Sequence, residues 1–215
     1  MLVWKHRCVY HLTQASNWPS IQQHGLLSTS TLLDLAGFEG SDRYEIERRQ
    51  RLEGRTLPNG AVIRDQTPIP PAALTRCLAN GLTPEDWYAE LNGRVFFWLD
   101  HRRLNRQRRA SRSLLQMVLV VDADALLFRY ARSAALTPFN TGNARRRPAR
   151  RGRETFVPYD EWRESGWFSE AKGLRTKLRA SSHKPVELTI REAVGDIMDF
   201  VIEVRQLGKD EYLAL

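Results

Sequence analysis

Two strongly apolar runs near the middle of the chain restrict its folding more than any other feature. Residues 94–99 (RVFFWL) and 114–121 (LLQMVLVV) have the length and the aromatic or β-branched content of buried strands. Between them lies an arginine-rich stretch with the pattern of a helix, and Asp122 then opens another short helix. The centre of the chain is therefore expected to pass from buried strand to helix and back.

The flanking regions add further strands and helices without a strict βαβ alternation. Residues 9–12 favour a short strand, and Ser16 or Asn17 then caps a helix that Gly25 ends. The pattern further predicts helices over residues 42–53 and 83–92, an extended segment over 134–138, a half-buried strand over 186–190 and a partner for it over 200–204. We expect an α+β fold and, because no linker interrupts the chain, a single domain over residues 1–215.

Length and composition exclude several classes of protein. A chain of 215 residues with 42% apolar residues can bury a real core, so it is not disordered, and it has no 20–50-residue repeat. The longest apolar run is far short of the ~20 residues of a membrane span, and the N-terminus has too short an apolar stretch for a signal peptide. Cys8 and Cys77 form no disulfide framework. We expect a cytoplasmic protein with no membrane partner.

The positive charge is concentrated in one stretch of the chain. Residues 94–153 contain 15 Arg and only three acidic residues, a net charge of +12, whereas the remaining residues carry a net charge of −4. Guanidinium groups bind phosphate with two parallel hydrogen bonds and stack on bases, so this stretch suits a nucleic-acid partner. A coding bias that replaces Lys by Arg accounts for the choice of residue but not for the clustering.

Two segments carry this charge. The first is the expected helix, with Arg102, Arg103, Arg106, Arg108, Arg109 and Arg112. The second is a loop at about 142–153, with Arg145, Arg146, Arg147, Arg150, Arg151 and Arg153. Its Pro, Gly and like charges favour a mobile connection. These six side chains are the predicted nucleic-acid-binding residues, and a solvated surface loop is the alternative.

Few motifs of known chemistry are present. The chain has no P-loop, no dinucleotide-binding GxGxxG, no GxSxG, and no histidine spacing typical of catalytic zinc, so we expect no metal. What remains is a small set of polar residues on apolar strands, chiefly His11 and Glu187. Glu187 stands between Val186 and Leu188, and a carboxylate at such a position needs a partner or a function unless it faces solvent.

Taken together, these segments resemble a known enzyme family. Tyr10-His11-Leu12-Thr13, Asn17, Ile21 and Gly25-Leu26-Leu27-Ser28 are similar to the N-terminal pattern YHIT…N…SI…GLLS of DarT-type nucleic-acid ADP-ribosyltransferases. The aromatic strand around Phe97 and the late-strand Glu187 fit the broader ADP-ribosyltransferase plan less tightly. The resemblance covers three short segments that span most of the chain and points to a divergent relative.

The resemblance implies a split two-sheet fold with flanking helices around a central cleft that binds NAD, which is the substrate. By this resemblance Glu187 and His11 are catalytic, and His11, Thr13, Gly25, Leu26 and Phe97 contact NAD. The chain departs from the family in two ways. Phe96, Phe97 and Trp98 stand where many relatives have a tyrosine, and the basic residue that follows the first helix has three candidates, Arg43, Arg48 and Arg49.

The first functional hypothesis is therefore an NAD-dependent transfer of ADP-ribose to a base of DNA or RNA, in a toxin or phage-defence effector with an antitoxin or immunity protein as a further partner. A protein acceptor stays open, because no residue distinguishes a base from a side chain. The alternatives are a catalytically degenerate nucleic-acid-binding protein and an RNA 2′-phosphotransferase.

Overall fold

A seven-stranded antiparallel sheet dominates the computed structural model, which describes residues 1–111 and 114–214. Its strand order is β11-β6-β1-β5-β9-β7-β8. The strands are β1 (Cys8–Gln14), β5 (Arg94–Trp98), β6 (Gln116–Asp122), β7 (Ala134–Thr137), β8 (Val157–Pro158), β9 (Glu187–Arg191) and β11 (Val201–Leu207). Two small ladders join β2 (Leu26–Leu27) to β10 (Ala193–Val194) and β3 (Arg55–Thr56) to β4 (Val62–Ile63).

The junction between β1 and β5 is the narrowest point of this sheet. β1 pairs with β6 along its whole length, and β5 pairs with β9 along its whole length. Between β1 and β5 the register has a single residue pair in the described chain, Tyr10 with Trp98. The half formed by β11, β6 and β1 therefore separates from the half formed by β5, β9, β7 and β8 beyond that pair.

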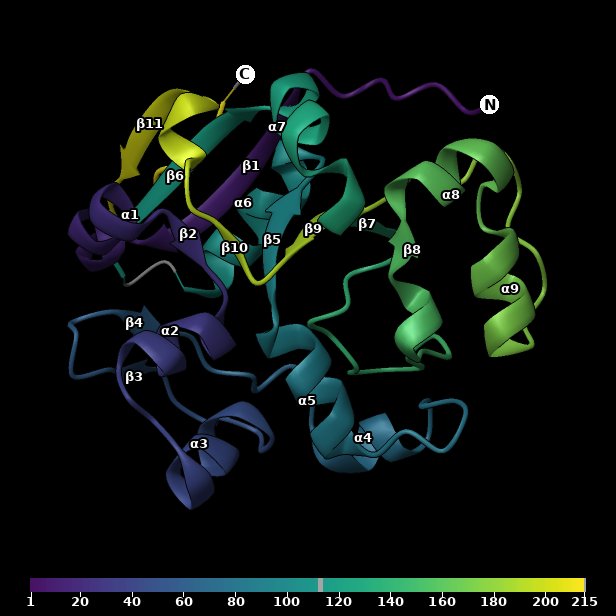
Figure 1. Ribbon diagram of the computed structural model, residues 1–215, viewed down its shortest axis with the longest axis horizontal. Helices are drawn as coiled ribbons and strands as arrows, with labels where there is room; N and C mark the ends of the chain where they lie inside the picture. The colour runs from purple at the N-terminus through teal and green to yellow at the C-terminus, as the bar shows by residue number, and fades with distance from the viewer. Residues whose placement is uncertain (112–113, 215) are drawn as a thin grey trace.

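The helices surround this sheet and carry clear terminal signals. They are α1 (Trp18–His24), α2 (Thr29–Leu35), α3 (Gly40–Glu47), α4 (Pro71–Thr75), α5 (Pro84–Asn92), α6 (His101–Ala110), α7 (Ala123–Tyr130), α8 (Tyr159–Ser165) and α9 (Phe168–Leu174). Thr83 and Asp86 form a capping box at α5, and the side chains of Asp100 and Asp122 accept backbone N–H bonds at the starts of α6 and α7. Figure 1 shows α3, α4 and α5 below the sheet and α8 and α9 beside β8.

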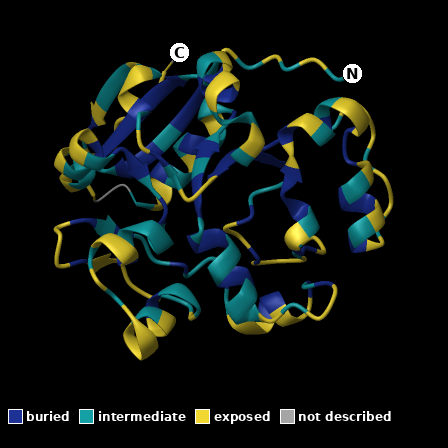
Figure 2. Ribbon diagram, viewed as in Figure 1, coloured by how far each residue is buried: buried dark blue, intermediate teal, exposed yellow. Residues whose placement is uncertain are grey.

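Two main apolar clusters occupy opposite faces of β5. Figure 2 shows that the strands at the centre of the molecule are mostly buried. Phe97 belongs to the larger cluster with Leu119, Leu126 and Leu188, whereas Phe96 packs against the cluster around Trp87. This division follows from the alternation of side chains along a strand. β5 is thus held from both sides, which fixes the position of every polar group next to it.

The α+β prediction is confirmed, and most expected strands and helices are present. The predicted pairing of residues 186–190 with 200–204 is wrong, because β9 pairs with β5 and β7 while β11 lies at the far edge on β6. After β9 the chain forms β10 on β2 and a 3-10 turn at Ile197–Asp199, which carries it across to that edge. Helices α2, α4, α8 and α9 were not expected. No helix in the described residues is long and apolar enough to cross a membrane.

Candidate functional site

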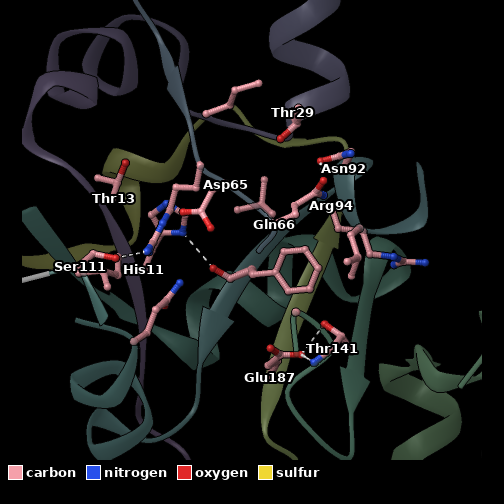
Figure 3. A pocket seen from close by; sticks show the side chains of 18 of the residues that line it. His11, Thr13, Thr29, Asp65, Gln66, Asn92, Arg94, Ser111, Thr141 and Glu187 are labelled. Carbon is pink, nitrogen blue, oxygen red and sulfur yellow. Dashed lines mark hydrogen bonds between the residues drawn. The ribbon is translucent and has the colours of Figure 1, made fainter. Parts of the chain in front are cut away.

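A cavity of about 860 Å³ lies where β1 and β5 separate. Its lining comes from β1, β5, the start of β9, the segment 61–69, α6 and the loop 140–145. Figure 3 shows several of these side chains, with His11 and Glu187 on different parts of the wall. All six residues predicted for catalysis or NAD binding line this central cavity: His11, Thr13, Gly25, Leu26, Phe97 and Glu187.

Glu187 is the first residue of β9 and is 4% exposed. Its Oε2 accepts hydrogen bonds from the Thr137 hydroxyl at 2.9 Å, the Thr141 hydroxyl at 2.9 Å and the Thr141 backbone N–H at 3.1 Å. No donor among residues 1–111 and 114–214 binds its Oε1. One carboxylate oxygen is therefore fixed by three bonds, and the other is left for a ligand in the central cavity.

Burial raises the pKa of Glu187 to about 6, because the charged carboxylate is desolvated. The hydrogen bonds from Thr141 and Thr137, and the positive charge of Arg151, act in the opposite direction. The net result is a carboxylate that is ionised at neutral pH and protonated under mildly acidic conditions. Its solvent has been replaced by fixed protein dipoles, which is the arrangement that favours electrostatic catalysis.

His11 joins the two halves of the sheet. Its Nδ1 lies 2.9 Å from the carbonyl oxygen of Phe96, and because a carbonyl only accepts, Nδ1 carries the proton. Desolvation by burial lowers the pKa of His11, and the nearby Arg64 lowers it further. The ring is therefore neutral at pH 7, and its Nε2 keeps a lone pair that can accept a bond from a ligand hydroxyl.

The other predicted NAD contacts have different structural roles. Gly25 has φ = +77° and ends α1, and a Cβ there would lie 2.4 Å from the carbonyl oxygen of Val194. Thr13 is buried, and its hydroxyl accepts a bond from Asn17. Leu26 and Phe97 are 3% and 1% exposed, so they contribute only small, largely covered parts of the cavity wall. The aromatic residues of β5 that keep partial exposure are Phe96 and Trp98, whereas the prediction placed Phe97 at the ligand.

Asn17 was part of the recognised pattern, and the structure shows what it does. Its side-chain amide bonds to both the N–H and the carbonyl of Val62, at 2.7 and 2.9 Å, and also to Thr13. It thereby ties β4 to the end of β1. This contact places the residues after β4 along the central cavity.

The arginine that follows β4 was missed by the sequence analysis. Arg64 lines the central cavity, and one of its guanidinium nitrogens donates to the Ser111 hydroxyl. The other terminal nitrogen is buried and has no hydrogen-bond partner among the described residues. Burial lowers the pKa of Arg64. The available signal was its place directly after the apolar run Ala61–Ile63, where a long cation needs a buried partner.

None of the three candidates for the basic catalytic residue lines the central cavity. Arg43 pairs with Asp34 and Glu47, and Arg48 and Arg49 pair with Asp86 and Glu45. Arg51 lines the cavity, but its guanidinium is committed to Ile46, Arg64 and Asn92. Of these arginines, Arg64 is therefore the one that lines the central cavity and keeps a guanidinium nitrogen without a partner in the described residues.

The arginine-rich segments divide into exposed and buried side chains. Arg145, Arg146, Arg147, Arg150 and Arg153 are exposed, and Arg145 lines the central cavity together with Arg103 and Arg106 of α6. Arg112 lies outside the described residues. The prediction that Arg151 binds nucleic acid is wrong, because this side chain is 1% exposed, donates to the carbonyls of Ala149 and Thr141 and packs on the rings of Trp87 and Phe139.

Arg108 is likewise buried and bonds to the carbonyls of Leu114 and Leu207. It supports the end of α6 and the end of β11 instead of facing a partner. In the described residues no group of three or more His, Cys, Asp or Glu is arranged to hold a metal ion.

Comparisons with known proteins give a family and a distant structural similarity. The model of a family of unknown function, DUF7002, matches residues 7–201, a range that includes β1, β5 and β9. No curated protein matches the chain. Among solved structures, DarT of Thermus sp. 2.9 in complex with ADP-ribosylated ssDNA has 13% sequence identity and a TM-score of 0.40, with 94% of this chain and 82% of that chain covered.

Proposed function

We propose that this chain, which belongs to the family of unknown function DUF7002, transfers ADP-ribose from NAD to a base of a nucleic acid. The observation that carries the proposal is the carboxylate of Glu187, held through one oxygen by Thr137 and Thr141 and open to the central cavity through the other. The resemblance of the segment 10–28 to DarT-type enzymes supplies the reaction class.

The reaction breaks the glycosidic bond between the ribose and nicotinamide, and positive charge develops on the ribose as the bond lengthens. A fixed, ionised carboxylate stabilises that charge more in the transition state than in the ground state. The neutral His11 presents Nε2 to a ribose hydroxyl, and Arg64 presents a buried positive charge to the diphosphate of NAD. These roles give each of the three polar groups, the buried Glu187 and the half-buried His11 and Arg64, a function at one cavity.

The acceptor side of the proposal rests on charge. Arg103, Arg106 and Arg145 line the same cavity as Glu187, and α6 brings further exposed arginines next to them. Phosphates of a single-stranded DNA or RNA would bind these guanidinium groups while one base enters beside Glu187. The half-buried ring of Phe96 offers an apolar surface for stacking.

The direct test is incubation of the protein with NAD labelled in its adenylate part and with separate pools of DNA, RNA and protein. We expect label on nucleic acid, and we expect NAD to stabilise the protein in a thermal-shift titration. A folded protein that shows no response at millimolar NAD contradicts the enzyme, whereas label on protein alone contradicts the nucleic-acid acceptor.

A further inference from the structure

A second, smaller cavity of about 170 Å³ lies at the outer end of β5, away from Glu187, and we refer to it as the arginine pocket. Its ionisable lining residues are Arg48, Arg94, Arg153 and Arg191 together with Asp86 and Glu90. They come from the end of α3, from α5, from the adjacent strands β5 and β9, and from the turn before β8. Four guanidinium groups thus face two carboxylates.

Both carboxylates of the arginine pocket already accept bonds from residues of the chain. Glu90 accepts from Arg153 at 3.1 Å and from Arg94 at 3.3 Å. Asp86 has one oxygen in the capping box with Thr83 and the other 3.5 Å from Arg48. Arg191 forms no ion pair within the described chain. The lining therefore carries an excess of two positive charges at neutral pH.

Arg94 and Arg191 are directly opposed across β5 and β9, so their side chains leave the same face of the sheet. Like charges at such a cross-strand position repel each other. Arg94 cannot move away, because its side chain is 3% exposed and its guanidinium lies 4.0 Å over the ring of Phe156. Its Nε is buried and has no acceptor among the described residues.

We propose that the arginine pocket binds a phosphate group, with Arg94 and Arg191 as its principal ligands and Arg48 and Arg153 at the rim. A phosphate supplies the acceptors that the Arg191 guanidinium lacks, and it neutralises the two excess charges. The volume is well below the ~300–1,000 Å³ of a typical small-molecule site, so it suits a single compact anion. Arg94 also lines the central cavity, but none of the contacts of the arginine pocket involves Glu187 or His11, so the proposal does not depend on the NAD reaction.

The test is a titration with inorganic phosphate at constant ionic strength, followed by calorimetry and by ³¹P NMR line width. The variant is Arg191→Gln, which removes an exposed side chain and leaves the buried Arg94 in place. The matched control is Arg132→Gln, which removes an exposed arginine remote from both cavities. We expect Arg191→Gln to weaken phosphate binding about tenfold or more, since a charge-assisted contact is lost, and Arg132→Gln to bind like the wild type.

A second measurement separates this site from a merely structural arginine. Without phosphate, Arg191→Gln should unfold at the same or a higher temperature than the wild type, because the repulsion from Arg94 is relieved. With phosphate the order should reverse. Equal phosphate affinity in the wild type and Arg191→Gln, or an equal loss in Arg132→Gln, overturns the proposal.

Competition then identifies the source of the phosphate. Displacement of inorganic phosphate by a nucleoside monophosphate alone indicates a terminal phosphate, and displacement by an oligothymidylate without terminal phosphates indicates a nucleic-acid backbone. Both results support a phosphate site.

Discussion

The sheet wall of the central cavity and the arginine-rich segments beside it are organised in opposite ways. On the sheet wall, which is formed by β1, β5 and the start of β9, His11 and Glu187 are each held by bonds to defined partners; Glu187 is buried and His11 is half-buried. In the loop 142–153, adjacent arginines differ sharply, since Arg150 is exposed and Arg151 is among the most buried side chains of the protein. A polar residue on a strand is thus placed by the sheet, whereas an arginine in a basic loop is placed by whichever carbonyls and rings the loop meets.

The strongest test of the sheet wall is Glu187→Gln. Glutamine keeps the size and an acceptor oxygen, so the fold and NAD affinity should change little, but the negative charge is lost. We expect turnover to fall about 10²–10³-fold, roughly 3–4 kcal/mol in activation free energy, as for removal of one preorganised electrostatic group. Single-turnover transfer and an NAD titration measure the two quantities separately.

The matched control for that variant is Glu203→Gln, a strand glutamate on β11 that does not line the central cavity. It should be close to silent. Turnover of Glu187→Gln at the wild-type rate would mean that another carboxylate acts, and Glu154 and Glu161 would be tested next. In the wild type, transfer should decline as the pH falls through about 6, since Glu187 becomes protonated there.

The contrast within the basic loop predicts opposite effects for two neighbouring arginines. Arg151→Ala leaves the carbonyls of Ala149 and Thr141 without their donor and removes a cation from the Trp87 and Phe139 rings. We expect a loss of about 3 kcal/mol in the free energy of unfolding. Arg150→Ala should stay within about 0.5 kcal/mol of the wild type. Urea unfolding of both variants measures the difference, and equal stabilities would show that Arg151 is not a structural residue.

Arg64 lines the central cavity and also acts on His11 of the sheet wall through its charge. The variant Arg64→Gln therefore tests both groups at once. Loss of a charge-assisted contact to a diphosphate should weaken NAD binding about 10–100-fold. The same change should raise the pKa of His11, because Arg64 lowers it by charge repulsion. An NMR titration of the histidine ring measures the second effect without any ligand. An unchanged His11 pKa would show that the two groups do not interact.

The sequence was sufficient to predict residues whose position depends only on their own strand and on the alternation of side chains along it. His11 and Glu187 were singled out because polar residues interrupt apolar strands, and Thr13 was added by the resemblance of the N-terminal segment. A strand then brings each of the three to the cavity. Arg151, Arg64 and the edge position of β11 could not be found in this way. Each depends on contacts between residues far apart in sequence, such as Arg64 with Ser111 and β11 with β6. Phe97 shows a finer limit, because it is buried whereas its neighbours Phe96 and Trp98 keep partial exposure, and the sequence alone does not distinguish the three rings.

The buried carboxylate also gives the sheet wall a measurable pH dependence of stability. The pKa of Glu187 is raised from 4.5 to about 6 on folding, so its stabilising contribution is fully present below pH 4.5 and is lost as the pH rises through about 6. The loss is about 2 kcal/mol. Glu187→Gln lacks this titration. We therefore expect the variant to gain about that much stability relative to the wild type as the pH rises from 4.5 to 7, measured by urea unfolding. A difference in unfolding free energy that stays constant over this pH range would contradict the raised pKa.

The smallest effects are expected from the exposed arginines, where the two basic groups can be compared directly. The mouth group is Arg103, Arg106 and Arg145, which line the central cavity, and the outer group is Arg146, Arg147 and Arg150. Each phosphate contact to a single strand contributes about 0.7 to the slope of log K against log salt, so changing the mouth group to Gln should flatten the slope by about 2. A short oligonucleotide reaches the mouth group only. Changing the outer group to Gln should therefore flatten the salt slope for long strands and leave the slope for short strands unchanged.

A matched triple variant of Arg55, Arg129 and Arg132 removes the same charge from surfaces away from the central cavity. Because it lowers the net charge equally, it separates local phosphate contacts from the long-range field of the protein. If this control flattens the slope as much as the mouth group does, nucleic acid is attracted by net charge alone. The arginines at the cavity would then be no more than part of a basic surface. The sheet wall would hold the specific binding and catalytic groups, and the arginine-rich segments would contribute only a general attraction for nucleic acid.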